Sequence, residues 1–395
     1  MKQQAKHAIY IGTLCSVSYL AVYFARNILS AVTPQMVEGG GFTNEYIGTV
    51  SSVYLVCYAV GQLINGMLGD KIKAKYMISG GLLFAGIFNL IFSKVAVNPT
   101  AAIAVYGLTG FCLSMIYGPM TKVVAENTDP LYTPRCTLGY TFASFVGTPM
   151  AGVMAAAFTW QSVFGISSAL LVLMAVISFT FFYIFEKRGI VRYRQYATKK
   201  EQGGGLRILI RHRIIRFTLI SIITGVVRTS VVFWLPTYIS EHLGFSAETS
   251  ARLFTAATFV ICFTAFISIF LYERLHYNMD RTILVLFSTS TLLFVGVYFV
   301  RQPMINLILL VLAIMASNGS ATMLYSRYCP GLRDTGMVSA ATGFLDFVSY
   351  VAAAGSNILF ANAASSIGWG NLILVWGGLT LLGILTITIK KPRSE

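Results

Sequence analysis

Three ionisable side chains lie in the middle of long apolar runs of this sequence: Arg26, Arg228 and Asp346. A charge at the centre of a bilayer costs at least about 2.5–3.5 kcal/mol, so a residue of this kind usually has a function. Arginine stays charged and offers a planar fork that binds phosphate or carboxylate through two hydrogen bonds. The residue types therefore predict a site for a multiply charged anion that engages both arginines.

Other roles for these three groups stay open. Each arginine could instead pair with a buried carboxylate or with backbone carbonyl groups. Asp346 could balance one arginine, carry a proton, or bond to helix ends at a gate.

Polar side chains at helical spacing accompany the charges. Tyr19, Tyr23 and Arg26 form one stripe, because residues three or four apart share a helix face. Three further stripes are Tyr58 with Gln62, Asn318 with Tyr325, and Asp346 with Tyr350. Such stripes predict helix faces toward a water-filled cavity, although tyrosine and small polar residues also serve at membrane interfaces and between helices.

The elements that position these residues must be membrane helices. The chain has 395 residues, of which 56% are hydrophobic and 11% charged, and its mean hydropathy is +0.72. Soluble domains carry about 45–50% apolar and about 25% charged residues. The composition therefore excludes both a soluble globular domain and a disordered chain.

A spanning helix needs about 20 mainly apolar residues. The sequence predicts twelve such spans: 9–36, 45–69, 76–94, 99–122, 136–158, 160–185, 213–240, 249–272, 282–300, 304–327, 337–362 and 368–389. The first is expected to be a retained membrane helix, since it is too long for a signal peptide and no small-residue cleavage site follows it.

The net charge of +15 is mainly a topology signal. Lys and Arg gather at the two ends and in the even-numbered connections, whereas the odd-numbered connections hold only Lys94, Arg252 and Arg301. Positive residues mark cytoplasmic loops. We therefore expect a multi-pass protein of the cytoplasmic (inner) membrane with both termini in the cytoplasm, and no binding of nucleic acid.

A polar connection at 186–212 divides the chain into two halves, 1–185 and 213–395. The spacing from Arg26 to Pro34 in the first half equals that from Arg228 to Pro236 in the second. Matching six-span halves indicate a duplicated transporter whose substrate binds near mid-membrane. No P-loop or zinc-protease motif is present, so neither an enzyme nor a cofactor or metal is expected.

The connection after the second span reads Gly66-x-x-x-Asp70-Lys71. It resembles the signature of the major facilitator superfamily, with Lys73 and Ala74 where glycine and arginine are usual. The resemblance implies an all-α integral membrane fold of twelve transmembrane helices in two pseudo-symmetric six-helix halves. It also implies a gating role for Asp70 and Lys71.

Within that superfamily, the Y-x-x-x-Y-x-x-R-N stretch ending at Asn27 and the R-x7-P stretch at Arg228 resemble the organophosphate:phosphate antiporters. The resemblance implies that a monomer exchanges an organic phosphate for inorganic phosphate by alternating access. Two departures, Gln62 where that family often has lysine and a fifth span without histidine, predict that the organic part of the substrate is read differently. The candidate substrate-binding residues are Arg26, Arg228, Tyr19, Tyr23, Asn27, Tyr58, Gln62, Asn318, Tyr325 and Tyr350.

Three alternatives keep the same fold. One is proton-coupled symport of an organic anion such as a carboxylate, with Asp346 as the proton carrier. The others are a transporter-like sensor that binds an anion and a carrier of lipids.

Overall fold

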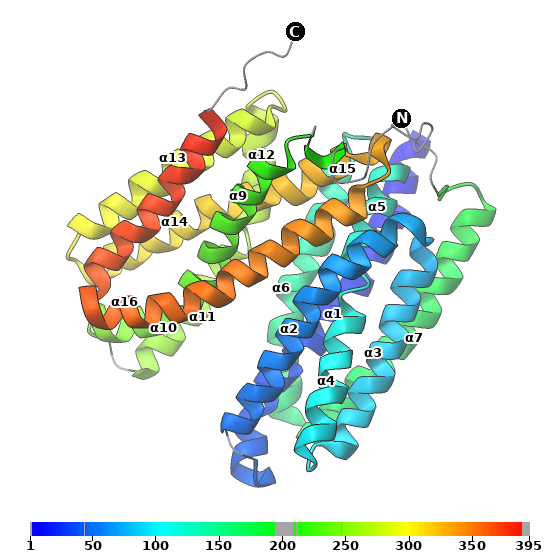
Figure 1. The fold of residues 1–395 in the computed structure, drawn as a ribbon, viewed down its shortest axis with the longest axis horizontal. Helices are drawn as coiled ribbons and strands as arrows, with labels where there is room; N and C mark the ends of the chain where they lie inside the picture. Colours follow the sequence, from blue (N-terminus) through cyan, green and yellow to red (C-terminus); the bar gives the residue numbers. More distant parts are fainter. Residues whose placement is uncertain (1, 43, 194–207, 211, 246, 389–395) are drawn as a thin grey trace. The chain divides into compact units, whose positions relative to one another are not determined.

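The computed structural model describes residues 2–42, 44–193, 208–210, 212–245 and 247–388, and every regular element in these ranges is a helix (Figure 1). Eleven helices are long and apolar enough to cross a membrane. A further helix of 25 residues, α6 (Thr133–Ala157), occupies the place of the fifth expected span. The prediction of an all-α integral membrane fold is confirmed.

Two compact units make up the chain. Unit 1 contains Met1–Ile208 and Cys329–Phe347, and unit 2 contains Leu209–Tyr328 and Val348–Glu395. The short segment Cys329–Phe347 thus packs with unit 1, although it comes from the second half of the sequence. Most of the connection expected at 186–212 lies outside the described residues.

Unit 1 is built from long helices, and its most extensive packing joins helices that are not adjacent in the sequence. In it, α1 packs on α6 and α7, α2 on α4, and α3 on α4 and α7. A turn at 114–116 separates α4 from α5 within one candidate span. The remaining helices of this unit are α1 (Lys2–Gly40), α2 (Asn44–Lys71), α3 (Ala74–Val95), α4 (Pro99–Leu113), α5 (Tyr117–Asn127) and α7 (Trp160–Lys187).

The second half of the sequence contains three π-helical stretches, η1 to η3, which wind more widely than an α-helix. Its elements are α9 (Ile214–Gly225), η1 (Val226–Val231), α10 (Val232–Thr237), η2 (Tyr238–His242), α11 (Ala247–Ile261), α12 (Thr264–Arg274), α13 (Met279–Phe299), α14 (Pro303–Met323), η3 (Leu324–Tyr328), α15 (Cys329–Gly331), the 3-10 turn η4 (Arg333–Thr335) and α16 (Val338–Thr388). The last two expected spans are continuous in α16, which kinks at Gly368. There φ is +77°, a value that glycine adopts without steric cost.

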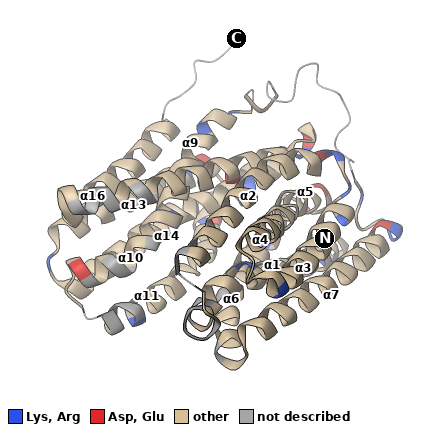
Figure 2. Cartoon of the chain, turned by 60° about the horizontal axis from the view of Figure 1, so that its bottom comes forward, with Lys and Arg blue, Asp and Glu red and all other residues tan. Residues whose placement is uncertain are grey.

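The surface has the character that a bilayer requires. Large apolar side chains stand exposed on the helices, among them Val153, Phe259 and Leu292 at 67–72% exposure. Most charged residues lie at helix ends and in connections (Figure 2). The protein is therefore a multi-pass membrane protein.

Candidate functional site

In unit 1, Arg26 lies over the rings of Tyr23 and Tyr58, which together with Tyr19 form a cluster here termed the tyrosine nest. Its guanidinium carbon is 4.7 Å from the ring centroid of Tyr58 and 5.3 Å from that of Tyr23. Tyr19, one turn earlier on α1, contacts Tyr23 edge-on at 5.0 Å and stacks on Tyr117 at 5.4 Å. A cation over an aromatic face is attracted by the ring quadrupole, by about 2 kcal/mol or more where water is excluded. The nest therefore offsets part of the cost of placing Arg26 in the membrane.

The polar stripe on α2 divides into satisfied and unsatisfied members. Asn65 donates to the Ser114 hydroxyl at 2.7 Å, so it ties α2 to α4. Gln62 is 1% exposed, and neither amide atom of its side chain has a hydrogen-bond partner among the described residues. An unsatisfied buried amide costs about 1–3 kcal/mol, so a ligand or water that reaches Gln62 would be bound favourably. Asn27 instead donates to the Tyr23 carbonyl at 2.6 Å within α1.

Asp346 is 5% exposed and belongs to the part of α16 that packs in unit 1. It lies close enough to Tyr19 for the two side chains to interact electrostatically.

In unit 2, Arg228 lies inside η1 rather than in a regular α-helix. Its guanidinium carbon is 5.8 Å from the ring centroid of Tyr350 on α16. Ser230, in the same stretch, donates to the carbonyl of Ala353 at 2.9 Å. Ser230 and the close approach of Gly225 to Ser349 thus place η1 against α16 on both sides of the arginine.

The other two candidates of this unit lie on one helix. Asn318 is 8% exposed in α14, and its side-chain oxygen has no hydrogen-bond partner within the described residues. Tyr325 is 7% exposed and lies in η3. The expected spacing of these residues on one α-helical face is therefore interrupted where the helix becomes π-helical.

Asp70 caps the start of α16 within unit 1. Its two carboxylate oxygens accept hydrogen bonds from the backbone N–H groups of Ser339 at 2.9 Å and Ala340 at 2.8 Å. These first-turn N–H groups have no acceptor within their own helix, and the helix dipole favours a negative charge there. Lys122 lies 3.7 Å from the same carboxylate and donates to the carbonyls of Gly69 and Asp70.

Glycines allow α2, α5 and α16 to approach closely around this cap. Gly66 has no room for a side chain, since a Cβ there would lie 2.9 Å from the Ser339 carbonyl oxygen. A Cβ at Gly343 would collide with the carbonyl oxygen of Gln62, and one at Gly118 would crowd the Ser339 hydroxyl. Lys71, the last residue of α2, is exposed.

Several residues of these sites escape a reading of the sequence. Tyr117 and Tyr140 reach the nest from α5 and α6, where no periodic polar pattern points to them. Lys122 is 6% exposed although it counts as a loop charge by sequence. Tyr54 could have been found from the sequence, because it precedes Tyr58 by one helical turn. In the structure its ring stacks on that of Tyr58 at 6.2 Å. Within the described residues, no group of three or more His, Cys, Asp or Glu side chains is placed to hold a metal ion.

Curated relatives align at low identity. The membrane sensor protein UhpC of Salmonella typhimurium is 28% identical over 74 residues, which span 19% of this chain and only 17% of that protein. The glycerol-3-phosphate transporter of Bacillus subtilis is 22% identical over 271 residues, or 61% of this chain and 59% of that protein. The hexuronate transporter of the same organism is 21% identical over 395 residues, or 92% of this chain and 90% of that protein.

The fold and the family agree. The solved structure of the Escherichia coli fucose:proton symporter FucP superposes with a TM-score of 0.77 over 98% of this chain and 100% of that chain, at 14% identity. The family model of the Major Facilitator Superfamily matches residues 15–356. The chain therefore belongs to the Major Facilitator Superfamily.

Proposed function

We propose that this protein exchanges an organic phosphate for inorganic phosphate by alternating access. The observation that carries the proposal is Arg26, a permanent charge held over the rings of Tyr23 and Tyr58 inside a membrane helix. Stacking engages the face of a guanidinium, whereas an anion is bound by its in-plane N–H groups. The nest around Arg26 is thus compatible with phosphate binding.

The second half of the proposal is that the same anion also engages Arg228. It is supported by the sequence repeat that places both arginines at the same distance from a proline, and by the duplicated architecture of the family. The remaining ligands proposed are Tyr19, Tyr23, Asn27, Tyr58, Gln62, Asn318, Tyr325 and Tyr350. The relative named as a glycerol-3-phosphate transporter supports a phosphate ester as substrate.

A second candidate is proton-coupled symport of an organic carboxylate. The relative named as a hexuronate transporter favours it, because the alignment covers 92% of this chain. In this candidate Asp346, which is buried within unit 1, carries the proton.

We further propose that the protein is a monomer in the cytoplasmic membrane with both termini in the cytoplasm, as the distribution of Lys and Arg favours. The connection 70–74, here termed the gate loop, then faces the cytoplasm. Asp70 closes a gate when it caps α16, and Lys71 contributes positive charge at its edge. The hydrogen bonds from Ser339 and Ala340 support this role for Asp70.

The test is exchange in proteoliposomes loaded with inorganic phosphate. We expect external glycerol phosphate or hexose phosphate to release labelled phosphate one for one, whether or not a pH gradient is present. Two results together would instead establish the second candidate. The unmodified protein would take up hexuronate in response to a pH gradient, and the Asp346→Asn protein would only exchange hexuronate without concentrating it. Phosphate that raises the unfolding temperature without any exchange would indicate an anion sensor.

A further inference from the structure

The chain folds back on unit 1 directly after α7. The helix ends at Lys187, and Gly189 has a φ of +67°, the left-handed conformation that terminates helices. The N–H groups of Ile190 and Val191 then donate to the carbonyl of Phe185 at 2.9 and 3.1 Å. Val191 is 1% exposed. These residues are therefore anchored, although they begin the connection between the two units.

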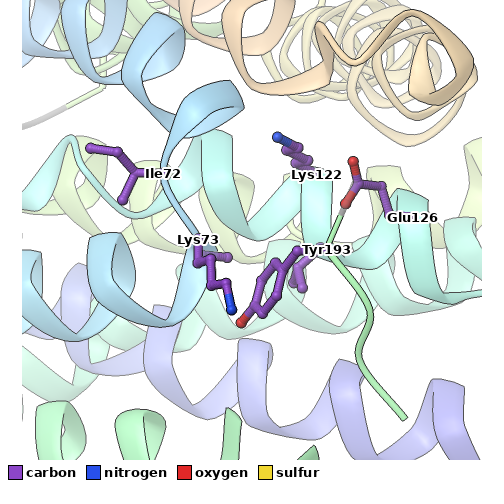
Figure 3. Close-up of a pocket in the computed structure, with 7 residues that line it drawn as sticks. Ile72, Lys73, Lys122, Glu126 and Tyr193 are labelled. Carbon is purple, nitrogen blue, oxygen red and sulfur yellow. The ribbon is translucent and has the colours of Figure 1, made fainter. Parts of the chain in front are cut away.

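The next two residues reach the end of α5. The Arg192 N–H donates to the side-chain oxygen of Asn127 at 2.6 Å. Tyr193 lines a small pocket beside the gate loop, together with Lys73 and Lys122 (Figure 3). The Lys73 ammonium is 5.4 Å from the centroid of the Tyr193 ring.

Glu186 holds the gate loop from the other end of the same turn. Its carboxylate pairs with Lys73 at 2.5 Å and also with Lys75. One short stretch, 186–193, thus contacts the gate loop through an acid that pairs with two lysines and through a ring that packs under one of them.

We propose that residues 190–193, here termed the strap, hold the gate loop against α5 and thereby position Asp70 for its cap on α16. The inference rests on the gating role proposed above. Tyr193 is a positioning residue in this scheme, because it acts through Lys73 and Lys122 and does not touch the anion.

Hydrogen exchange of the purified full-length protein without substrate tests the strap. The amides of Ser339 and Ala340 are protected by the Asp70 carboxylate, so their exchange rate reports how often the cap opens. We expect Tyr193→Ala and Asn127→Ala each to raise that rate roughly five- to tenfold. Two conservative variants serve for comparison: Tyr193→Phe keeps the ring, and Asn127→Asp keeps the acceptor for the Arg192 N–H. In both, the exchange rate of the two amides should stay within about twofold of that in the unmodified protein.

The matched control is Tyr298→Ala, an exposed tyrosine on α13 in unit 2, which should leave these amides unchanged. Unchanged exchange in both the Tyr193→Ala and Asn127→Ala proteins would overturn the strap, and so would an equal rise in the control or in the conservative variants. No substrate is needed, so the result stands apart from whether phosphate is the transported anion. Failed phosphate exchange with the expected hydrogen-exchange pattern would overturn only the transport proposal.

Discussion

The two membrane arginines occupy matching positions of the sequence repeat but different local structures. Arg26 lies in α1, a continuous α-helix, with the rings of Tyr23 and Tyr58 at 5.3 and 4.7 Å. Arg228 lies in the π-helical stretch η1, and the ring of Tyr350 is 5.8 Å away. A π-helical turn is rare, because it departs from the optimal hydrogen-bond geometry of the α-helix. Where such a turn occurs, it is often at a functional site.

The two arginines are therefore repeated in sequence but are expected to differ in function. The regular helix and the two rings hold Arg26 in one orientation. The wider turn around Arg228 leaves a backbone that can tighten into a regular α-helix, which would turn the side chains on either side of it. We therefore expect unit 1 to provide the fixed anchor for the anion and unit 2 the part that adjusts as the anion binds.

The largest effect is expected from the arginines themselves. Arg26→Lys and Arg228→Lys keep the charge but lose the two-pronged hydrogen bond, so each should lower phosphate exchange in proteoliposomes about 10- to 100-fold. Arg26→Lys should be the more severe, because an ammonium group cannot lie flat between two rings.

The matched control is Arg301→Lys, which changes an exposed arginine in a connection and should exchange normally. Normal exchange by both membrane variants would show that neither arginine binds the transported anion. A more severe loss in the Arg228 variant would reverse the assignment of the fixed anchor.

A smaller effect should separate the rings that contact the two arginines. Tyr58→Leu keeps most of the volume and removes the aromatic face, which costs about 0.5–2 kcal/mol and so weakens apparent phosphate affinity about 2- to 30-fold. Tyr350→Leu should have a weaker effect, since its ring lies farther from the guanidinium. Tyr58→Phe keeps the face and should bind nearly as well as the unmodified protein.

The measurement is the midpoint of the phosphate-induced rise in unfolding temperature. Equal weakening by Tyr58→Leu and Tyr58→Phe would assign the effect to the hydroxyl group instead of the ring. If Tyr58→Leu and Tyr350→Leu weakened phosphate affinity equally, the two rings would contribute equally to their arginines, contrary to this prediction.

The sequence predicted much of this architecture because membrane burial imposes strong patterns. Apolar runs, the low charge and the three embedded ionisable groups predicted the helices, and the tyrosine stripe on α1 predicted that Tyr23 shares a face with Arg26. The roles of these residues in binding remain predictions. The resemblance to the major facilitator superfamily, drawn from the gate loop, is confirmed by the match over residues 15–356.

Features that depend on packing could not be predicted in the same way. A π-helical stretch such as the one around Arg228 has no composition of its own, because backbone register and neighbouring helices decide it. By sequence, Lys122 counts as a charge in a connection, yet the structure buries it against Asp70. It is buried because glycines allow α2, α5 and α16 to approach closely. Tyr193 lies under the gate loop because α7 ends at Lys187, the chain turns at Gly189, and the Arg192 N–H donates a hydrogen bond to Asn127. None of these features has a sequence motif.

The smallest expected effect compares one serine hydroxyl that bonds between helices in each unit. In unit 1, Ser18 donates to the Leu14 carbonyl and shares a 2.9 Å hydrogen bond with Ser178 on α7, where both hydroxyls are buried. In unit 2, Ser230 donates to the carbonyl of Ala353, which as part of a continuous helix keeps its own helical bond when the serine is removed. Hydrogen bonds between membrane helices contribute about 0.6 kcal/mol on average and about 1.7 kcal/mol at most.

Ser18→Ala should therefore destabilise the protein by about 1 kcal/mol, since it leaves the Ser178 hydroxyl without its partner on α1, and Ser230→Ala by less. Reversible unfolding in mixed detergent measures both, with Ser93→Ala, whose hydroxyl bonds only within its own exposed turn, as the control. A larger loss in the Ser230→Ala protein would mean that this one bond holds η1 in its π-helical form. Unit 2 would then be fixed around its arginine as firmly as unit 1, and adjustment on anion binding would have to come from elsewhere in the fold.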